Sequence, residues 1–175
     1  MRETYLIDIR RTYRTYRKLA ESAIAQVSDE HLHTALGVED NSIAVVMQHV
    51  AGNLRSRFSG FLTSDGEKPD RNRDAEFESR PDADRSELLD EWDAAWAILL
   101  GELDALRPED LDRTVHIRYE PFTVVEALNR SVTHTAYHVG QIVYLAKHLA
   151  ANWKTLSIPR GKSAEYGTGT VKQRT

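Results

Sequence analysis

Residues 123–150 read TVVEALNRSVTHTAYHVGQIVYLAKHLA and combine a helix-start signal, a long apolar stripe and two histidines. Thr123, followed three residues later by Glu126, forms a capping box, in which two side chains satisfy backbone amides that the first helical turn leaves without partners. Apolar residues then recur at intervals of three and four, which predicts one amphipathic helix ending at about Ala150. Its apolar stripe needs other helices to cover it.

The two histidines of this helix share one side of it. His134 and His138 lie about 40° apart, because each residue turns the helix by about 100°. Gln141 falls in the same stripe, whereas the apolar residues centre roughly 120° away. Both imidazoles are therefore expected at the edge of the buried face. Histidines four residues apart on a helix are a standard way to bind a transition metal, with nitrogen about 2.0–2.1 Å from zinc.

Three more segments show the same helical spacing, and almost no segment alternates as a strand does. The predicted helices are residues 3–27, about 42–62 and about 85–106. Asn41 or Ser42 is a natural cap for the second of them. The polar segment 64–84, broken by one glycine and two prolines, is expected to be an irregular loop, and loops of this length are usually functional or mobile.

The remaining segments complete an all-α, four-helix-bundle prediction. Residues 114–123 give the only hint of extended structure, a short strand or hairpin arm in a crossover, and the tail is expected to loosen from about residue 160. Four amphipathic helices in a chain of this length favour a bundle, and we expect one domain over residues 1–175.

Composition narrows the function. The 175 residues contain no cysteine, which excludes disulfides, thiolate nucleophiles and zinc fingers. The formal net charge of −4 argues against nonspecific nucleic-acid binding. No run approaches the about 18 apolar residues of a membrane span, and we expect a cytoplasmic protein with no membrane partner. The basic residues of the first helix are interpreted as a solvated face: Arg10, Arg11, Arg14, Arg17 and Lys18.

The helix at 42–62 repeats the arrangement of the final helix. His49 lies at the edge of its apolar face, with Asn53 in the same stripe. If the two helices face each other, His49 joins His134 and His138 in a three-histidine site at the mouth of a groove. The alternative is a buried structural histidine beside a chance pair. The other histidines, placed in loops, the crossover or a helix end, favour structural roles: His31, His33, His116 and His148.

Three stretches together carry a family resemblance: NSIAVVMQH (41–49), DGEKPDRNRD (65–74) and HTAYHVGQIVYLAKH (134–148). With them the chain resembles the DinB-like superfamily, and is most similar to a bacterial branch of unknown function. The resemblance implies a bundle with up-down-down-up helices, often a homodimer, that holds a divalent metal through three histidines. Those positions match His49, His134 and His138. Members with assigned activities are transferases that use the thiols bacillithiol or mycothiol, or related isomerases and hydrolases.

The expected function is therefore that of a metal-dependent transferase of the thiol S-transferase type, acting on a low-molecular-weight thiol and a small electrophile. The reacting group would be a thiol or water at the metal, and Asn53 and Gln141 are candidates to orient the site. Zinc, nickel, manganese or iron would suit it. The alternatives are a metal-dependent hydrolase and a non-catalytic metal-binding stress-response protein. Four basic residues are either anion contacts near the pocket or ordinary solvated charges: Arg57, Arg71, Arg73 and Lys154.

Overall fold

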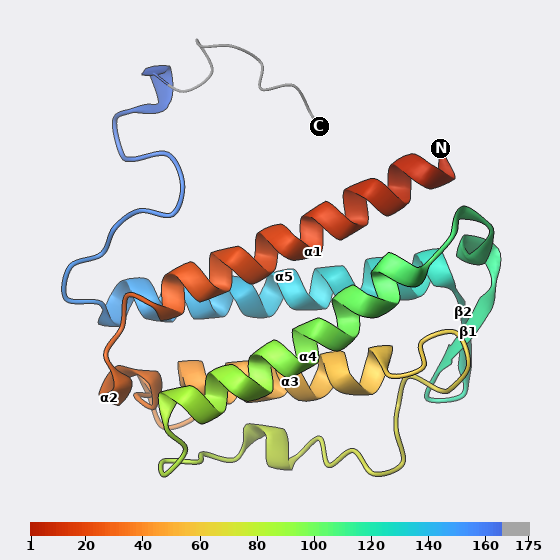
Figure 1. The fold of residues 1–175 in the computed structure, drawn as a ribbon. Helices are drawn as coiled ribbons and strands as arrows, with labels where there is room; N and C mark the ends of the chain where they lie inside the picture. The colour runs from red at the N-terminus through yellow and green to blue at the C-terminus, as the bar shows by residue number, and fades with distance from the viewer. Residues whose placement is uncertain (166–175) are drawn as a thin grey trace.

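The computed structural model describes residues 1–165, and nearly all regular structure in this part of the chain is helical (Figure 1). The long helices are α1 (Arg2–Ile24), α3 (Ile43–Phe58), α4 (Arg85–Ala105) and α5 (Val124–Leu149). The short elements are α2 (Asp29–Leu32), β1 (Thr114–Ile117), β2 (Glu120–Thr123) and the 3-10 turns Ala75–Phe77, Pro108–Asp112 and Ser163–Glu165. This content agrees with the all-α prediction. The part of the predicted tail from residue 166 onward lies outside the described residues.

Side-chain caps begin three of the long helices where the sequence predicts them. The Ser42 hydroxyl accepts the Val45 amide proton at the start of α3. Thr123 and Glu126 form the reciprocal capping box of α5, with the Glu126 carboxylate accepting the Thr123 amide at 2.7 Å. α4 starts in the same way after Asp84. Each cap satisfies amide donors that a helix start otherwise leaves without partners.

Three details of the helix prediction were wrong. α1 ends at Ile24, one turn before the expected end at residue 27. α3 ends at Phe58, about one turn before the expected end near Leu62, because the chain reverses at Gly60, where φ is +64°. That left-handed conformation suits glycine, which has no Cβ to clash with the backbone. His31 does not lie in an irregular loop but in the single turn of α2, whose Ser28 cap accepts the His31 amide.

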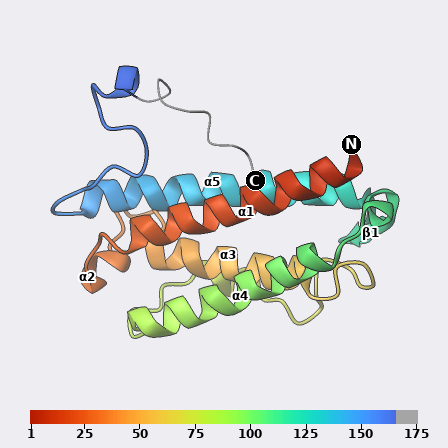
Figure 2. The same cartoon turned by 45° about the horizontal axis from the view of Figure 1, so that its top comes forward.

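The long helices form two pairs, with α1 beside α5 and α3 beside α4, as both views show (Figures 1 and 2). α3 also contacts α5, so the pairs share an apolar core. α3 and α4 run in one direction, and α1 and α5 run in the other (Figure 1). Trp92 and Trp96 of α4 are fully buried, and Tyr13 of α1 meets Trp96 edge to face at 6.3 Å. Large aromatic side chains therefore fill the space between the pairs.

The basic cluster of α1 is more than the solvated face that its composition suggested. Arg10 donates to the backbone oxygens of Leu103 and Leu106, at 2.9 and 2.8 Å, at the carboxyl end of α4. Two further arginines reach carboxylates on α4, in the pairs Arg14–Asp104 and Arg17–Asp93. Positive charge at a helix carboxyl terminus stabilises the orphan carbonyls there, so this cluster joins α1 to α4.

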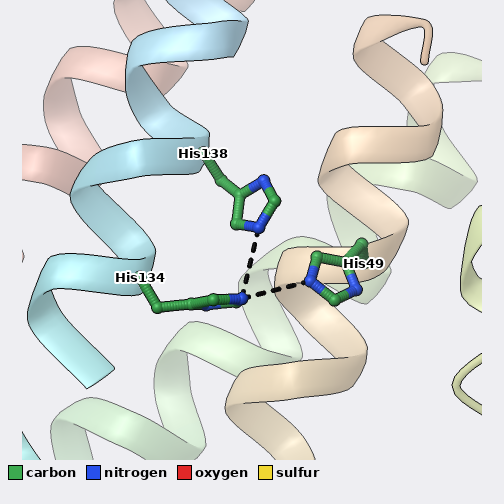
Figure 3. A group of neighbouring side chains, drawn as sticks. All are labelled: His49, His134 and His138. Atoms are coloured by element: carbon green, nitrogen blue, oxygen red, sulfur yellow. Dashed lines mark hydrogen bonds between the residues drawn. The ribbon is translucent and has the colours of Figure 1, made fainter. Parts of the chain in front are cut away.

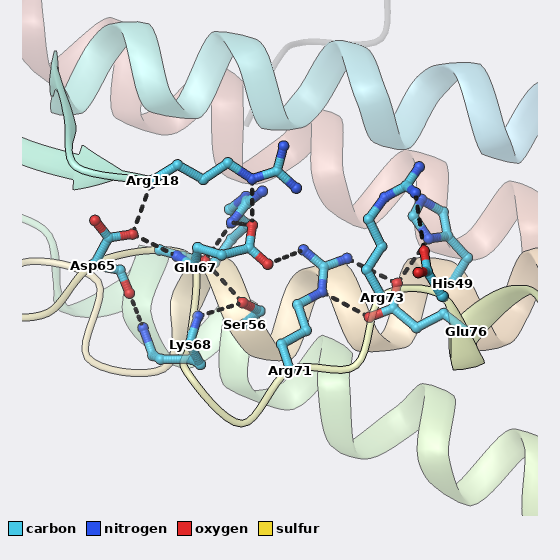
Figure 4. A network of polar contacts seen from close by, with 12 residues as sticks. His49, Ser56, Asp65, Glu67, Lys68, Arg71, Arg73, Glu76 and Arg118 are labelled. Atoms are coloured by element: carbon cyan, nitrogen blue, oxygen red, sulfur yellow. Dashed lines mark hydrogen bonds and ion pairs between the residues drawn. The ribbon is translucent and has the colours of Figure 1, made fainter.

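The predicted extended segment is a complete hairpin. β1 and β2 pair antiparallel, with Thr114 opposite Thr123 and Ile117 opposite Glu120. The two turn residues, Arg118 and Tyr119, have φ of 56° and 65°. Their amides donate to the Asp65 carboxylate at 2.9 and 2.8 Å, which fixes this turn against segment 64–84. The turn conformation presents the Arg118 side chain toward α3 and α5 (Figure 4).

Segment 64–84 lies along α3 and is bound to it at both ends (Figure 1). The Ser56 hydroxyl donates to Gly66 O and accepts the Lys68 amide. Farther along, the Gln48 amide donates to three backbone oxygens around the 3-10 turn Ala75–Phe77. The segment is thus an irregular but anchored cover of α3. Among the described residues, no helix combines the length and apolar character that crossing a membrane requires.

Candidate metal centre

Three imidazole rings meet between α3 and α5 (Figure 3). The Nε2 atom of His134 lies 3.2 Å from the Nε2 atoms of both His49 and His138. One nitrogen from each ring falls within 4.8 Å of the other two. The three residues that the sequence singled out are therefore brought together, two from one helix and one from another.

The cluster is more enclosed than the sequence suggested. His49 is 3% exposed and His138 8% exposed, whereas both were expected at the edge of the buried face. For His49 the reason is the anchored loop, whose Phe77 ring covers it at a centroid distance of 4.4 Å. A helical projection cannot include such a cover, because the loop comes from another part of the chain.

The outer nitrogens of two rings are held by acceptors. His49 Nδ1 donates to the Glu76 carboxylate at 2.9 Å, and His138 Nδ1 donates to Gln141 Oε1 at 2.8 Å. An N–H at Nδ1 leaves Nε2 of the same ring as a lone-pair acceptor, so both rings direct a lone pair into the cluster. Histidines that bind metals are commonly oriented by a carboxylate or amide acceptor in this way.

Glu76 is the functional residue that sequence reasoning missed. It sits in the irregular loop, where no periodic spacing relates it to His49. Arg71 grips its carboxylate with two hydrogen bonds of 2.7 and 2.8 Å (Figure 4). Burial alone would raise the pKa of Glu76, but the hydrogen bonds from Arg71 and His49 outweigh burial and lower this pKa below its usual value. Glu76 is therefore a carboxylate that fixes the His49 ring.

Burial favours the neutral form of the two cluster histidines of α5, His134 and His138. Burial lowers the pKa of His134 to about 3, and the nearby groups of His138 and His49 act in the same direction. Burial also lowers the pKa of His138, against the opposing effect of its hydrogen bond to Gln141. Neutral imidazole is the form that binds metals, so neither of these rings must lose a proton near pH 7 to become a ligand.

The donor set fits a metal ion. In the protein alone, one N–H on His134 Nε2 can satisfy the lone pair of only one neighbouring ring at a time. A cation satisfies all three nitrogens together. Tetrahedral ligation with zinc–nitrogen bonds of about 2.0–2.1 Å places neighbouring nitrogens about 3.3 Å apart, and the two Nε2 separations here are 3.2 Å. The cluster could thus hold a divalent metal with little rearrangement.

A cavity of about 200 Å³ opens beside His49 and His134. Asn53, which the sequence placed near the histidines, lines this cavity and makes no contact with the rings themselves among the hydrogen bonds of residues 1–165. A larger cavity of about 580 Å³ lies between the loop and the outer side of α3, but no histidine lines it. The smaller cavity is therefore the one that reaches the cluster, at His49 and His134.

The structure also places the four basic residues and the remaining histidines that the sequence singled out. Arg57, Arg71 and Arg73 line the cavity beside the histidines, as one of the two interpretations proposed, whereas Lys154 does not. The other histidines stay outside the cluster in the described part of the chain, which matches their structural interpretation. One of them, His33, donates from Nε2 to the Ala83 backbone oxygen at 3.0 Å.

Comparison with known proteins adds a family to this geometry. No curated protein matches the chain. A family model described as "Protein of unknown function (DUF1572)" matches residues 1–162, which include both long helices that carry the histidines and the loop between α3 and α4. The chain therefore belongs to the DUF1572 family.

Proposed function

We propose that this protein binds a divalent transition metal through His49, His134 and His138 and acts as a metal-dependent transferase of the thiol S-transferase type. The observation that carries the metal site is the convergence of three imidazole nitrogens within 4.8 Å of one another, with the His134 Nε2 atom at 3.2 Å, a distance that suits tetrahedral ligation, from the Nε2 atoms of His49 and His138. The transferase activity rests on the resemblance to the DinB-like superfamily, together with the open cavity beside the nitrogens.

The side chains around the cluster have distinct tasks in this proposal. Glu76 and Gln141 keep Nδ1 of their histidines protonated, so that Nε2 faces the cluster. Three neutral nitrogen ligands bring no negative charge and leave a coordination position for substrate, which is typical of catalytic rather than structural sites. A divalent cation held there supplies a Lewis acid that lowers the pKa of a thiol or water. The chain has no cysteine, so a reacting thiol must come from a second substrate.

Two measurements test the proposal. Isothermal titration of the metal-free protein with zinc, nickel, manganese and iron(II) should give one site per chain. A turnover assay should then show metal-dependent consumption of a low-molecular-weight thiol in the presence of an electrophile such as a chlorinated nitrobenzene. Loss of both signals in His138→Ala, with both retained in His148→Ala on the same helix, is the expected result.

Other outcomes of the assay point to the alternatives. Product formed without thiol consumption identifies a metal-dependent hydrolase. Tight metal binding with no metal-dependent rate, across a broad panel of thiols and electrophiles, leaves a non-catalytic metal-binding protein. The homodimer expected from the resemblance stays a prediction, which sedimentation velocity measures directly.

A further inference from the structure

The cavity beside the histidines has an unusual charge composition. Five arginines line it, from α3, the loop, the hairpin turn and α5, and no carboxylate does so among the described residues: Arg57, Arg71, Arg73, Arg118 and Arg130. Guanidinium groups gathered around one small cavity repel each other unless anions compensate them. The compensating carboxylates lie outside the cavity lining.

Glu67 and Glu76, which do not line the cavity, neutralise part of the positive charge of its arginines (Figure 4). Glu67 pairs with Arg57 at 3.0 Å and with Arg118 at 2.9 Å, and it also lies 3.4 Å from Arg71. Glu76 pairs with Arg71 and His49. Two carboxylates therefore serve three arginines and one histidine, which fixes these guanidinium groups in place but leaves the cavity positive.

Arg73 and Arg130 have no comparable partner. The nearest carboxylate to Arg73 is that of the exposed Asp74, at 3.9 Å, and within residues 1–165 Arg130 forms no ion pair. Each guanidinium instead lies over an aromatic ring, Arg73 over Phe77 at 5.0 Å and Arg130 over Phe122 at 5.8 Å. Stacking on a ring face orients a guanidinium while leaving its N–H donors, which lie in the guanidinium plane, available to another group.

Asn53 adds a polar group to the cavity wall. It is 8% exposed and lines the cavity. Its side-chain amide forms no hydrogen bond in the described part of the chain and is not among the polar groups sealed from solvent, so it is free to bind a group in the cavity. A polar ligand in the cavity would supply a partner. The amide N–H group is a donor, as are the arginines, so an acceptor-rich group suits all of them.

We propose that this cavity binds an oxyanion of the substrate, a carboxylate or phosphate group, and so holds the substrate with its reacting end at the histidines. This inference rests on the proposed function and adds the chemical class of the substrate. Arginine forks match the planar oxygens of carboxylates and phosphates and form charge-assisted hydrogen bonds with them. The volume of about 200 Å³ is below the roughly 300–1,000 Å³ of drug-sized ligand sites, which restricts the group to a small one.

The test is a binding titration of the metal-free protein at low ionic strength, in which amide NMR spectra monitor binding. Inorganic phosphate and succinate are the two anionic probes, and the diamide of succinic acid is the uncharged control. We expect the NMR signals of residues that line the cavity, including the Asn53 side chain, to shift saturably with at least one of the two anions. The diamide should cause no such shift. Stronger binding of phosphate or of succinate identifies which oxyanion the substrate carries.

A matched pair of double variants separates the site from overall charge. Arg73→Gln with Arg130→Gln removes two guanidinium groups that hold no described element together, and should weaken anion binding about tenfold or more. Arg11→Gln with Arg160→Gln removes the same charge from residues outside the cavity lining. This control should change anion affinity by less than about twofold. Equal losses in both double variants, or no saturable shift in the wild-type protein, would overturn the inference.

Metal titration keeps this result apart from the proposed function. The Arg73, Arg130 double variant should bind metal as the wild-type protein does, because neither residue contacts a histidine in the described hydrogen bonds. His138→Ala should lose metal binding but keep anion binding in the metal-free state. A wild-type protein that binds the anions but no metal would refute the proposed function alone.

Discussion

The two sides of the histidine cluster are built in different ways. On α5, His134, His138 and Gln141 lie within two helical turns, so the helix itself sets their spacing. On α3, His49 depends on Glu76 and Phe77, which come from the loop; Glu76 lies 27 residues farther along the chain. One half of the site is local and the other half is tertiary. A variant on α5 should therefore act through the helix alone, whereas a variant on the α3 side should also disturb the contacts of the loop.

The largest effect should come from removing a nitrogen ligand, whichever side supplies it. His138→Ala and His49→Ala should each weaken metal binding by more than about 100-fold, which exceeds the loss typical of a residue that only orients a ligand. His148→Ala, exposed near the end of α5, should bind as the wild-type protein does. Calorimetric metal titration measures all three. Retained affinity in either cluster variant would show that its ring is not a ligand.

The next effect should distinguish the two sides. Glu76→Gln keeps the shape of the side chain but removes the charge that Arg71 and His49 both contact, and should lower metal affinity about 10–100-fold. Because one partner of a buried ion pair is lost, stability should also fall by up to about 3 kcal/mol. Metal titration and urea denaturation measure the two losses.

Gln141→Ala is the counterpart on α5. It removes a neutral acceptor from a half-buried position, while the helix still sets the spacing of the two histidines. We expect a smaller loss of metal affinity than in Glu76→Gln, below about tenfold, and little change in unfolding. If the two variants were equally impaired, the contrast between a local and a tertiary half would be wrong.

A weaker effect should appear as a pH dependence of the metal-free protein. Burial lowers the pKa of His134 from 6.5 to about 3, so the unfolded chain binds a proton there that the folded protein excludes. Stability should therefore be complete above about pH 6.5 and decrease as pH falls from there toward 3. The lowered pKa of Glu76 adds a loss of the same sign below 4.5.

Urea denaturation at pH 7.5, 6.0 and 5.0 checks this sign, with His134→Gln as the control. The variant has no titrating ring at position 134, so its unfolding free energy should change less over this range. A wild-type stability that stayed constant or rose on acidification would contradict the neutral cluster.

Two helical glycines, one on each side, should change stability in opposite directions. A Cβ at Gly52 would lie 2.4 Å from Glu76 Oε1, whereas a Cβ at Gly140 would meet nothing within 4 Å. Gly52→Ala should therefore destabilise the protein by about 1–3 kcal/mol by displacing Glu76. Gly140→Ala should stabilise it by about 0.5–1 kcal/mol, because alanine is the better helix former. Thermal unfolding of the two variants should shift in opposite directions, and a common direction would argue against the contact of Glu76 with α3.

Helical periodicity predicted much of the fold and part of the site. The starts of α3, α4 and α5 follow from apolar spacing and from capping residues such as Ser42 and Thr123. The pairing of His134 with His138 follows from the same spacing. The predictions for the end of α3 and for the turn of α2 were wrong. These features depend on a single backbone reversal and a single helical turn, and neither is long enough to show a periodic pattern in the sequence.

The loop contributions had no such signal. Arg71 had two interpretations, an anion contact or a solvated charge, and nothing in the sequence singled out Glu76, because a polar segment with glycine and prolines gives the same pattern whether it is free or anchored. Arg118 reaches the cavity only because a hairpin turn is held by Asp65. Contacts of this kind depend on where the segment packs, and packing involves residues that are distant in sequence.

The amino-acid sequence by itself determined the helices and placed two imidazoles on one stripe, because both follow from a repeat of 3.6 residues along a single segment. The tertiary structure decided that His49 would complete the cluster, that a carboxylate would orient its ring, and that arginines from four elements would line one cavity. The physical reason is that burial and charge pairing arise between segments brought together by folding, and no local period records which segments will meet.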